Sequence, residues 1–145
     1  MKSKLLHAIE GQRTFALVFE TGDDAVAGIR DFAKRQSLNV STLTAIGAFS
    51  DLVLGYFDWN KKTYRRIPVN EQVEVLSLVG NVVLKDGKPE VHAHVVVGKN
   101  DGTAHGGHLL AAHVRPTLEV VVVESPEHLR RVAREDSGLA LIDLG

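Results

Sequence analysis

The 145-residue sequence contains no cysteine, a single methionine and a single tryptophan, and only 6% of its residues are aromatic. Without cysteine the fold cannot use disulfides, so nothing in it depends on an oxidising compartment. No run approaches 18 uninterrupted apolar residues, which predicts no membrane span, and the apolar segment near the N-terminus is too short for a signal peptide. A cytoplasmic location is therefore expected.

The sequence also has little net charge, −1 at pH 7, which argues against a strong electrostatic footprint for nucleic acid. Low-complexity segments, repeats and long linkers are absent. The hydrophobic content of 44% and charged content of 24% are typical of a soluble globular protein. We therefore expect residues 1–145 to form one domain, long enough to bury about 68–70% of its unfolded surface.

Periodicity predicts a fold rich in strands. Leu5–Ile9 and Thr14–Glu20 read as two strands around a tight turn, and apolar residues at helical spacing then predict a helix over 23–36, capped by Thr21 or Asp23. From Val40 onward most of the text is β-branched or aromatic and predicts strands.

The C-terminal third predicts further elements. Pro116 is expected to end one strand, and Leu118–Val123 reads as a strand buried on both faces. Ser125 followed by Pro126 is a typical helix start, which predicts a short basic helix over His128–Glu135. The expected fold class is α+β, with a largely antiparallel mixed sheet and two helices.

Five of the seven histidines fall between residues 91 and 119. His92 and His94 are two apart in a β-branched run, so in a strand they share one face. His108 follows a turn-rich connection over 98–107 and opens another apolar run. If the two runs pair as antiparallel neighbours, three imidazoles converge, which is the pattern of an open zinc-type site. The alternative is that each histidine is an ordinary core or edge residue.

Two other histidines are ambiguous. His105 lies in the glycine-rich connection, where it is a solvated loop residue, a substrate-facing group or a fourth ligand; the first is favoured. His113 is five residues beyond His108, so in a regular strand it faces the opposite side. We expect it to be structural or exposed.

Three further residues are candidates for the same site. Glu119 follows the His108 segment and is a candidate for holding a metal ligand in place or for proton transfer, against the alternative of a surface carboxylate at a strand edge. Gly106 and Gly107 would allow the backbone to approach an ion or ligand closely, against the alternative of an ordinary flexible loop end.

Four stretches together resemble the plants-and-prokaryotes-conserved (PPC) domain: TAIGAFSDLVLGYFD, VEVLSLVGNVVLKDGKPEVHAHVVVG, DGTAHGGHLLAAHVRPTLEVVV and VAREDSGLALIDLG. This domain occurs in AT-hook nuclear proteins of plants and as single-domain proteins in bacteria and archaea. The resemblance implies an α+β fold, a homotrimer and a metal cluster that maps onto His92, His94 and His108. The histidine arrangement is also similar to that of acetolactate decarboxylases, which are zinc lyases, and only the three histidines carry over.

Two functional hypotheses follow. The first is a stand-alone PPC-type protein with a three-histidine divalent-metal site, zinc by preference, that binds a small ligand or catalyses an unknown metal-dependent reaction. The second is a DNA-binding or transcription-associated oligomeric module. Its local support is the alternation of Lys61, Lys62, Arg65 and Arg66 with Trp59 and Tyr64. Against it, the R-G-R-P core of an AT-hook is absent, and lysines on a hairpin edge protect that edge from pairing. The basic group of Arg130, Arg131 and Arg134 reads as a solvated helix face.

Overall fold

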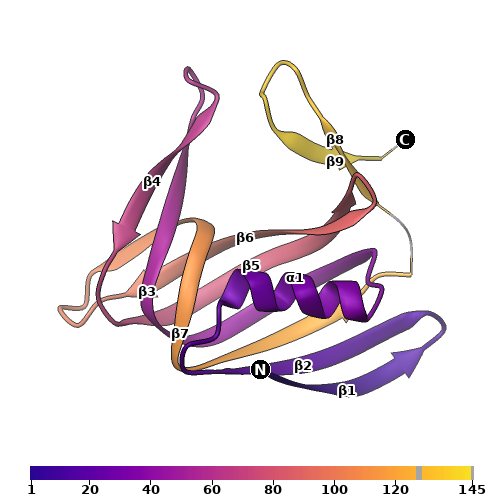
Figure 1. The fold of residues 1–145 in the computed structure, drawn as a ribbon, viewed down its shortest axis with the longest axis horizontal. Coiled ribbons are helices and arrows are strands. Elements are labelled where there is room, and N and C mark those ends of the chain that lie inside the picture. Colours follow the sequence, from indigo (N-terminus) through magenta and orange to yellow (C-terminus); the bar gives the residue numbers. More distant parts are fainter. Residues whose placement is uncertain (127–128, 145) are drawn as a thin grey trace.

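The computed structural model describes residues 1–126 and 129–144, which form one helix and nine strands (Figure 1). In chain order the elements are β1 (Lys2–Ile9), β2 (Gln12–Glu20), α1 (Ala25–Arg35), β3 (Val40–Asp58), β4 (Thr63–Val69), β5 (Val73–Lys85), β6 (Lys88–Gly98), β7 (Ala104–Glu124), β8 (Arg130–Ala133) and β9 (Ala140–Asp143). The predicted class is confirmed as a mostly β fold with a mixed, largely antiparallel sheet.

All nine strands belong to one sheet, with the order β1-β2-β7-β3-β5-β8-β9. In addition β4 pairs with β3, and β6 pairs with both β5 and β7. Only β5 and β8 pair in parallel. Because β3, β5, β6 and β7 each pair with the next and β7 returns to β3, their hydrogen bonds close a circuit. This circuit brings the glycine-rich beginning of β7 beside β6.

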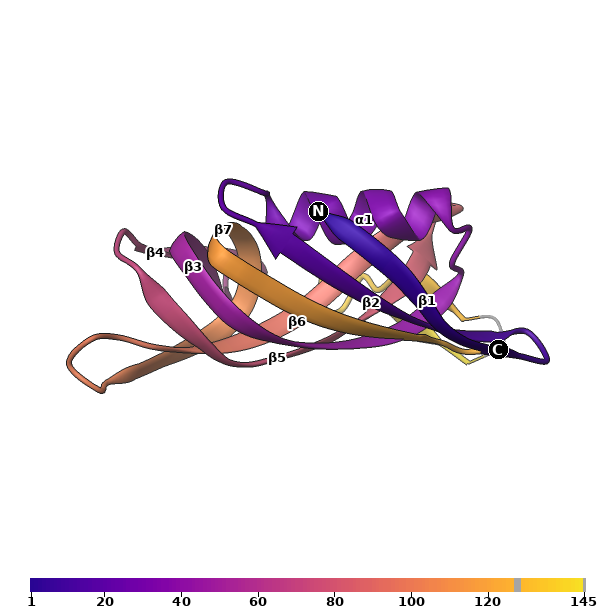
Figure 2. The same ribbon diagram turned by 90° about the horizontal axis from the view of Figure 1, so that it is seen from below.

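Helix α1 covers one face of the sheet, and no helix of the described residues covers the other (Figure 2). The residue that caps it is Asp24, whose side chain accepts from the Ala27 N–H, not Thr21 or Asp23. Asp23 instead accepts from the Glu20 N–H and pairs with the chain's amino terminus. In the described part of the chain no helix is long and apolar enough to cross a membrane.

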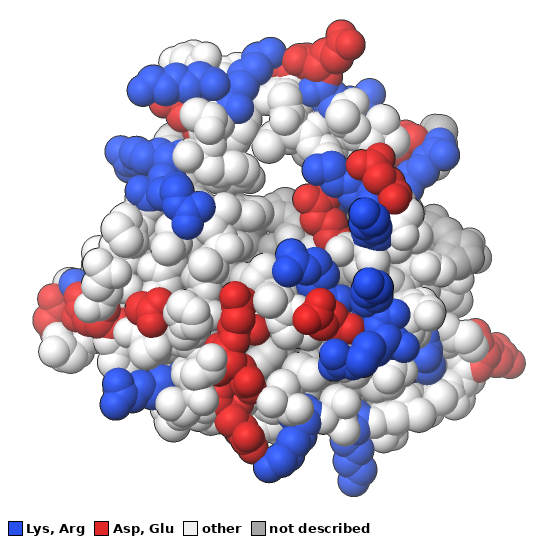
Figure 3. Space-filling view, in the orientation of Figure 1, with Lys and Arg blue, Asp and Glu red and all other residues white. Residues whose placement is uncertain are grey.

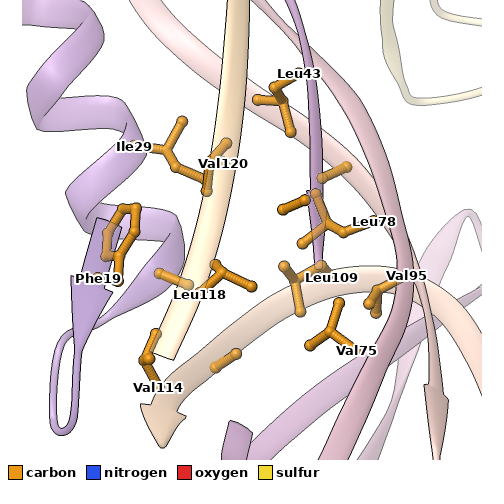
Figure 4. Packing of buried hydrophobic residues seen from close by; sticks show 14 of the residues in the cluster. Phe19, Ile29, Leu43, Val75, Leu78, Val95, Leu109, Val114, Leu118 and Val120 are labelled. Atoms are coloured by element: carbon orange, nitrogen blue, oxygen red, sulfur yellow. The ribbon is translucent and has the colours of Figure 1, made fainter. Parts of the chain in front are cut away.

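The core lies between α1 and the sheet (Figure 4). Ile29 on the helix meets Phe19, Leu118 and Val120 on the strands beneath it. Burial alternates along the end of β7, where Leu118 and Val120 are buried but Val121 is 42% exposed. The prediction that this strand is buried on both faces is therefore wrong for the single chain, because only one sheet face is covered.

Two other element predictions are corrected. The expected second helix is wrong over Arg130–Ala133, which forms β8 between the end of β5 and β9; its expected start at His128 lies outside the described residues. The sheet edge at Leu84 and Lys85 supplies hydrogen-bond partners that local sequence signals do not reveal. Pro116 does not end a strand either, because β7 continues through it, with register shifts where β3 bends alongside.

Candidate metal centre

His92, His94 and His108 converge on the sheet face that α1 leaves uncovered. His92 and His94 project from β6 on the same side, since the intervening Ala93 is buried in the core. His108 on β7 is the direct register partner of His94, so their side chains lie next to each other. One ring nitrogen from each of the three residues lies within 4.8 Å of the others. The convergence predicted from the sequence is confirmed.

The spacing of two of these nitrogens fits a tetrahedral ion. The Nε2 atoms of His92 and His94 are 3.3 Å apart. Two nitrogens bound to one zinc ion at roughly 2.0–2.1 Å and a tetrahedral angle are about 3.3–3.4 Å apart. One ring nitrogen of His108, Nδ1, is buried and forms no hydrogen bond with the described residues. Three imidazoles, two of them with nitrogens at this spacing, form the kind of donor set that zinc takes.

The protonation state also suits a cation. Burial lowers the pKa of His108 to about 4, and the neighbouring His92, His94 and Arg131 contribute further. Burial likewise lowers the pKa of His92, followed by the charge of Arg131. Both rings are thus neutral at pH 7, and each has one nitrogen lone pair of the kind that a metal ligand needs.

Arg131 is the main residue of this region that sequence reasoning missed. It is 8% exposed, and its Nη2 donates to Asn81 Oδ1 at 2.7 Å and to His92 Nδ1 at 3.1 Å, while Nη1 donates to the Ala140 carbonyl at 3.1 Å. The expected solvated helix face is wrong for this residue because β8 is a strand. The local sequence does not distinguish Arg131 from its neighbour Arg130, which is exposed on the same strand.

A cavity of about 250 Å³ opens beside His92 and His108. Tyr64 from β4 forms part of its wall and lies against the His108 ring, with 4.8 Å between ring centroids. Arg131, Lys85 and Glu90 also line it. One carboxylate oxygen of Glu90 is buried without a hydrogen-bond partner among the described residues, and the other lies 3.6 Å from Lys85 Nζ. The histidines thus border a space with both cationic and anionic walls.

The family model of the Plants and Prokaryotes Conserved domain (abbreviated PCC or PPC) matches residues 7–126. The chain belongs to this family. A plant- and prokaryote-conserved protein of Pyrococcus horikoshii is 33% identical with a TM-score of 0.86, and 98% of this chain and 94% of that one are covered. A metal-containing protein of Archaeoglobus fulgidus is 39% identical with a TM-score of 0.84, over 97% and 98% of the two chains.

Two further comparisons bear on this PPC-domain chain. A candidate DNA-binding protein of Bacteroides thetaiotaomicron is 27% identical with a TM-score of 0.86, over 97% and 96% of the chains. A Staphylococcus aureus protein described as similar to α-acetolactate decarboxylase is 12% identical, with a TM-score of 0.56 over 76% and 51% of the chains, and this likeness shows the fold alone. The comparison with curated proteins gave no match.

The remaining candidate residues of the PPC domain lie outside the cluster. His105 is exposed on β7 opposite Val97, in a strand and not in a loop. His113 is exposed and its Nδ1 lies 2.8 Å from Asp51 Oδ1, which raises its pKa. Glu119 is exposed and has Val18 and Ile46 as register partners. Its part of β7 is separated from β6 by β3 and β5, three strand spacings or about 14 Å, so the structure does not bring it to the histidines.

Gly106 and Gly107 are ladder residues of β7 opposite Val96 and Val95, so neither ends a flexible loop. A β-carbon at Gly107 would lie 2.9 Å from the Gly55 carbonyl oxygen on β3. At Gly106 it would lie 3.2 Å from the Val95 carbonyl oxygen. Close packing of β7 between β6 and β3 therefore supplies a structural reason for both glycines.

Proposed function

We propose that this PPC-domain protein holds one divalent metal ion, zinc by preference, on His92, His94 and His108. The observation that carries the proposal is the convergence of three imidazole nitrogens with the 3.3 Å spacing between two of them. Three protein nitrogens leave a coordination position for water or a ligand, as in zinc sites that do chemistry. The metal-containing relative from Archaeoglobus fulgidus supports the proposal.

The cavity beside the histidines makes the site suited to small-ligand binding or to a metal-dependent reaction. A zinc ion held there would polarise a carbonyl or lower the pKa of a bound water to about 7. Of the carboxylates, Glu90 lines the cavity with a buried and unpartnered oxygen, which makes it the group best placed to accept a proton from a ligand. Tyr64 and Arg131 shape the space and orient what enters it.

Metal analysis of protein purified without a histidine tag tests the proposal. We expect about one zinc per chain in the wild type, and a loss of tenfold or more in affinity for His92→Ala and His108→Ala, because each removes one of three ligands. His105→Ala and His113→Ala are matched controls, since both histidines are exposed and lie outside the cluster. Folded wild-type protein that takes up no metal would contradict the proposal, as would equal losses in all four variants.

We further propose that the protein assembles as a homotrimer through the sheet face that carries the site. Large apolar side chains are exposed on this face, among them Ile46 at 62%, Val79 at 52% and Val121 at 42%. Exposed apolar clusters of this kind mark association surfaces. Because Glu119 is remote from the histidines of its own chain, the proton-transfer role predicted for it requires a neighbouring subunit.

A second candidate function, binding of nucleic acid, rests on the arm formed by β3 and β4. Trp59 and Tyr56 are each 62% exposed there, and the Arg65 guanidinium stacks on Tyr56 at 5.6 Å. Figure 3 shows basic side chains over this arm, but acidic ones are scattered among the basic ones across the rest of the same face. Three basic residues of the arm, Lys61, Arg65 and Arg66, together with Trp59, suit a short single strand better than a long duplex.

A salt titration separates the two candidates. If the arm binds nucleic acid, affinity falls steeply with salt and Arg65→Gln with Arg66→Gln weakens it, while metal content is unchanged. Absence of binding to single-stranded or duplex DNA at low salt would remove the second candidate.

A further inference from the structure

We propose that the cavity beside the three histidines binds a small organic acid, with its carboxylate on the Arg131 guanidinium and a neighbouring hydroxyl or keto oxygen directed to the metal position. This inference rests on the proposed metal site and assigns it a ligand class. The evidence for it is that Arg131 is buried, is incompletely hydrogen-bonded and lines the cavity.

The guanidinium of Arg131 is a buried charge without a counter-ion. Among residues 1–126 and 129–144 its partners are the neutral acceptors of Asn81, Ala140 and His92, and no carboxylate forms an ion pair with it. Its Nε is buried and forms no hydrogen bond with any of these described residues. A buried charge is costly unless it is paired, and guanidinium matches carboxylate in shape and charge. The cavity that Arg131 lines is where such a partner would enter.

Metal binding at His92 would leave Arg131 with fewer hydrogen-bond acceptors. Arg131 Nη2 can donate to His92 Nδ1 only while that nitrogen carries no proton. A neutral imidazole that binds a metal through Nε2 carries its proton on Nδ1, so it no longer accepts from Arg131. The metal-loaded protein therefore leaves Arg131 with Asn81 and Ala140 as acceptors, and with more unpaired N–H groups than the structure shows.

The other walls of the cavity favour an acid of limited size. Its volume of about 250 Å³ is below the roughly 300–1,000 Å³ of sites for drug-sized ligands, which suits a small ligand. The charge of Lys85 is offset by Glu90, 3.6 Å away on the same wall, so Arg131 is the cation left to receive a carboxylate, and Tyr64 adds an apolar ring with a hydroxyl. Because the His92 ring separates Arg131 from the metal position, a ligand that reaches both needs oxygens on adjacent carbons. The 2-hydroxy and 2-oxo acids have this arrangement.

Calorimetric titration of zinc-loaded protein tests the inference, with lactate and pyruvate as probes and lactamide as the neutral counterpart of lactate. We expect lactate to bind at least about tenfold more tightly than lactamide, because hydrogen bonds between charged groups are the stronger ones. Arg131→Gln should reduce this preference to about twofold or less. Arg130→Gln is the matched control, since Arg130 is the exposed neighbour on β8 that pairs with Asp143, and it should keep the wild-type preference.

Metal content is measured on each sample, so two failures are distinguished. Wild-type protein that retains no metal overturns the metal site and this inference together. Metal-loaded wild type that binds lactate and lactamide equally, or binds inorganic phosphate as tightly as lactate, overturns the organic-acid subsite alone. If Arg131→Gln does not fold, Arg131→Lys takes its place and should weaken the preference for lactate, because an ammonium group cannot form the two-point pair with a carboxylate.

Discussion

His92 and His108 are kept neutral by burial, and this has a consequence for the metal-free protein. The pKa of His108 is about 4 in the folded chain against about 6.5 in the unfolded chain, and that of His92 is shifted in the same direction. Between pH 6.5 and 4 the unfolded chain therefore binds protons that the folded chain does not. Stability must fall as the pH drops through this window and be insensitive to these groups above it.

We expect the free energy of unfolding of metal-free protein, measured by urea denaturation, to be lower at pH 5 than at pH 7.5. The slope is at most about 1.4 kcal/mol per pH unit for each histidine and smaller here, because both rings are partly exposed. His108→Gln should flatten the profile. The control is His113→Gln, because His113 has the opposite pH dependence. Asp51 raises the pKa of His113, so the stability that this histidine contributes is present below pH 6.5 and is lost as the pH rises. An unchanged profile in His108→Gln would contradict the assignment.

The β5–β6 hairpin places His92 and His94 by close contact of two backbones. Gly80 on β5 is the register partner of Ala93, and a β-carbon there would overlap the His92 carbonyl oxygen and lie 2.8 Å from the Ala93 α-carbon. Backbone atoms cannot move aside as a flexible side chain can. The strand that carries the two histidines must therefore shift if position 80 gains a side chain.

Gly80→Ala should reduce stability by roughly 1–3 kcal/mol and weaken zinc retention, because the shift moves both β6 ligands away from His108 on β7. Gly98→Ala is the matched control on the same hairpin, since the atoms nearest to a β-carbon there belong to the Leu76 side chain and not to the backbone, the first of them at 3.3 Å. Denaturation and zinc competition measurements on the two variants check this. Equal zinc affinity in wild type and Gly80→Ala would show that the hairpin tolerates the shift.

The elements also show what the sequence can and cannot reveal. The convergence of the histidines could be predicted because it depends on short sequence separations. The i, i+2 spacing places His92 and His94 on one face of a single strand, and the turn-rich connection brings His108 opposite on the next strand. Glu119 was misplaced because its distance from β6 depends on two intervening strands that pair over long separations. Arg131 was missed because Ser125 and Pro126 are local helix signals, whereas β8 forms through its pairing with β5 and β9.

At the scale of the whole molecule, the site belongs to a row of side chains that runs across the uncovered sheet face. Ala16, Val121, Thr44, Val79, His94 and His108 are successive register partners from β2 across to the glycine-rich end of β7. Apart from Thr44, the residues of this row that lead from the sheet centre to the histidines are apolar. An association surface on this face would border the metal position and exclude water from one side of it.

Whether subunits associate through the uncovered sheet face can be tested by measuring the mass of the assembly. Sedimentation equilibrium of the wild type should give three times the chain mass of 15.8 kDa. Val121→Glu should give the mass of a single chain, because burying an unpaired carboxylate in each of three symmetric contacts costs more than the apolar contact supplies. Arg30→Glu, which adds an acid on α1 at the opposite face, should leave the mass unchanged. If Val121→Glu remains a trimer, subunits associate through another surface, and a neighbouring Glu119 has no route to the metal.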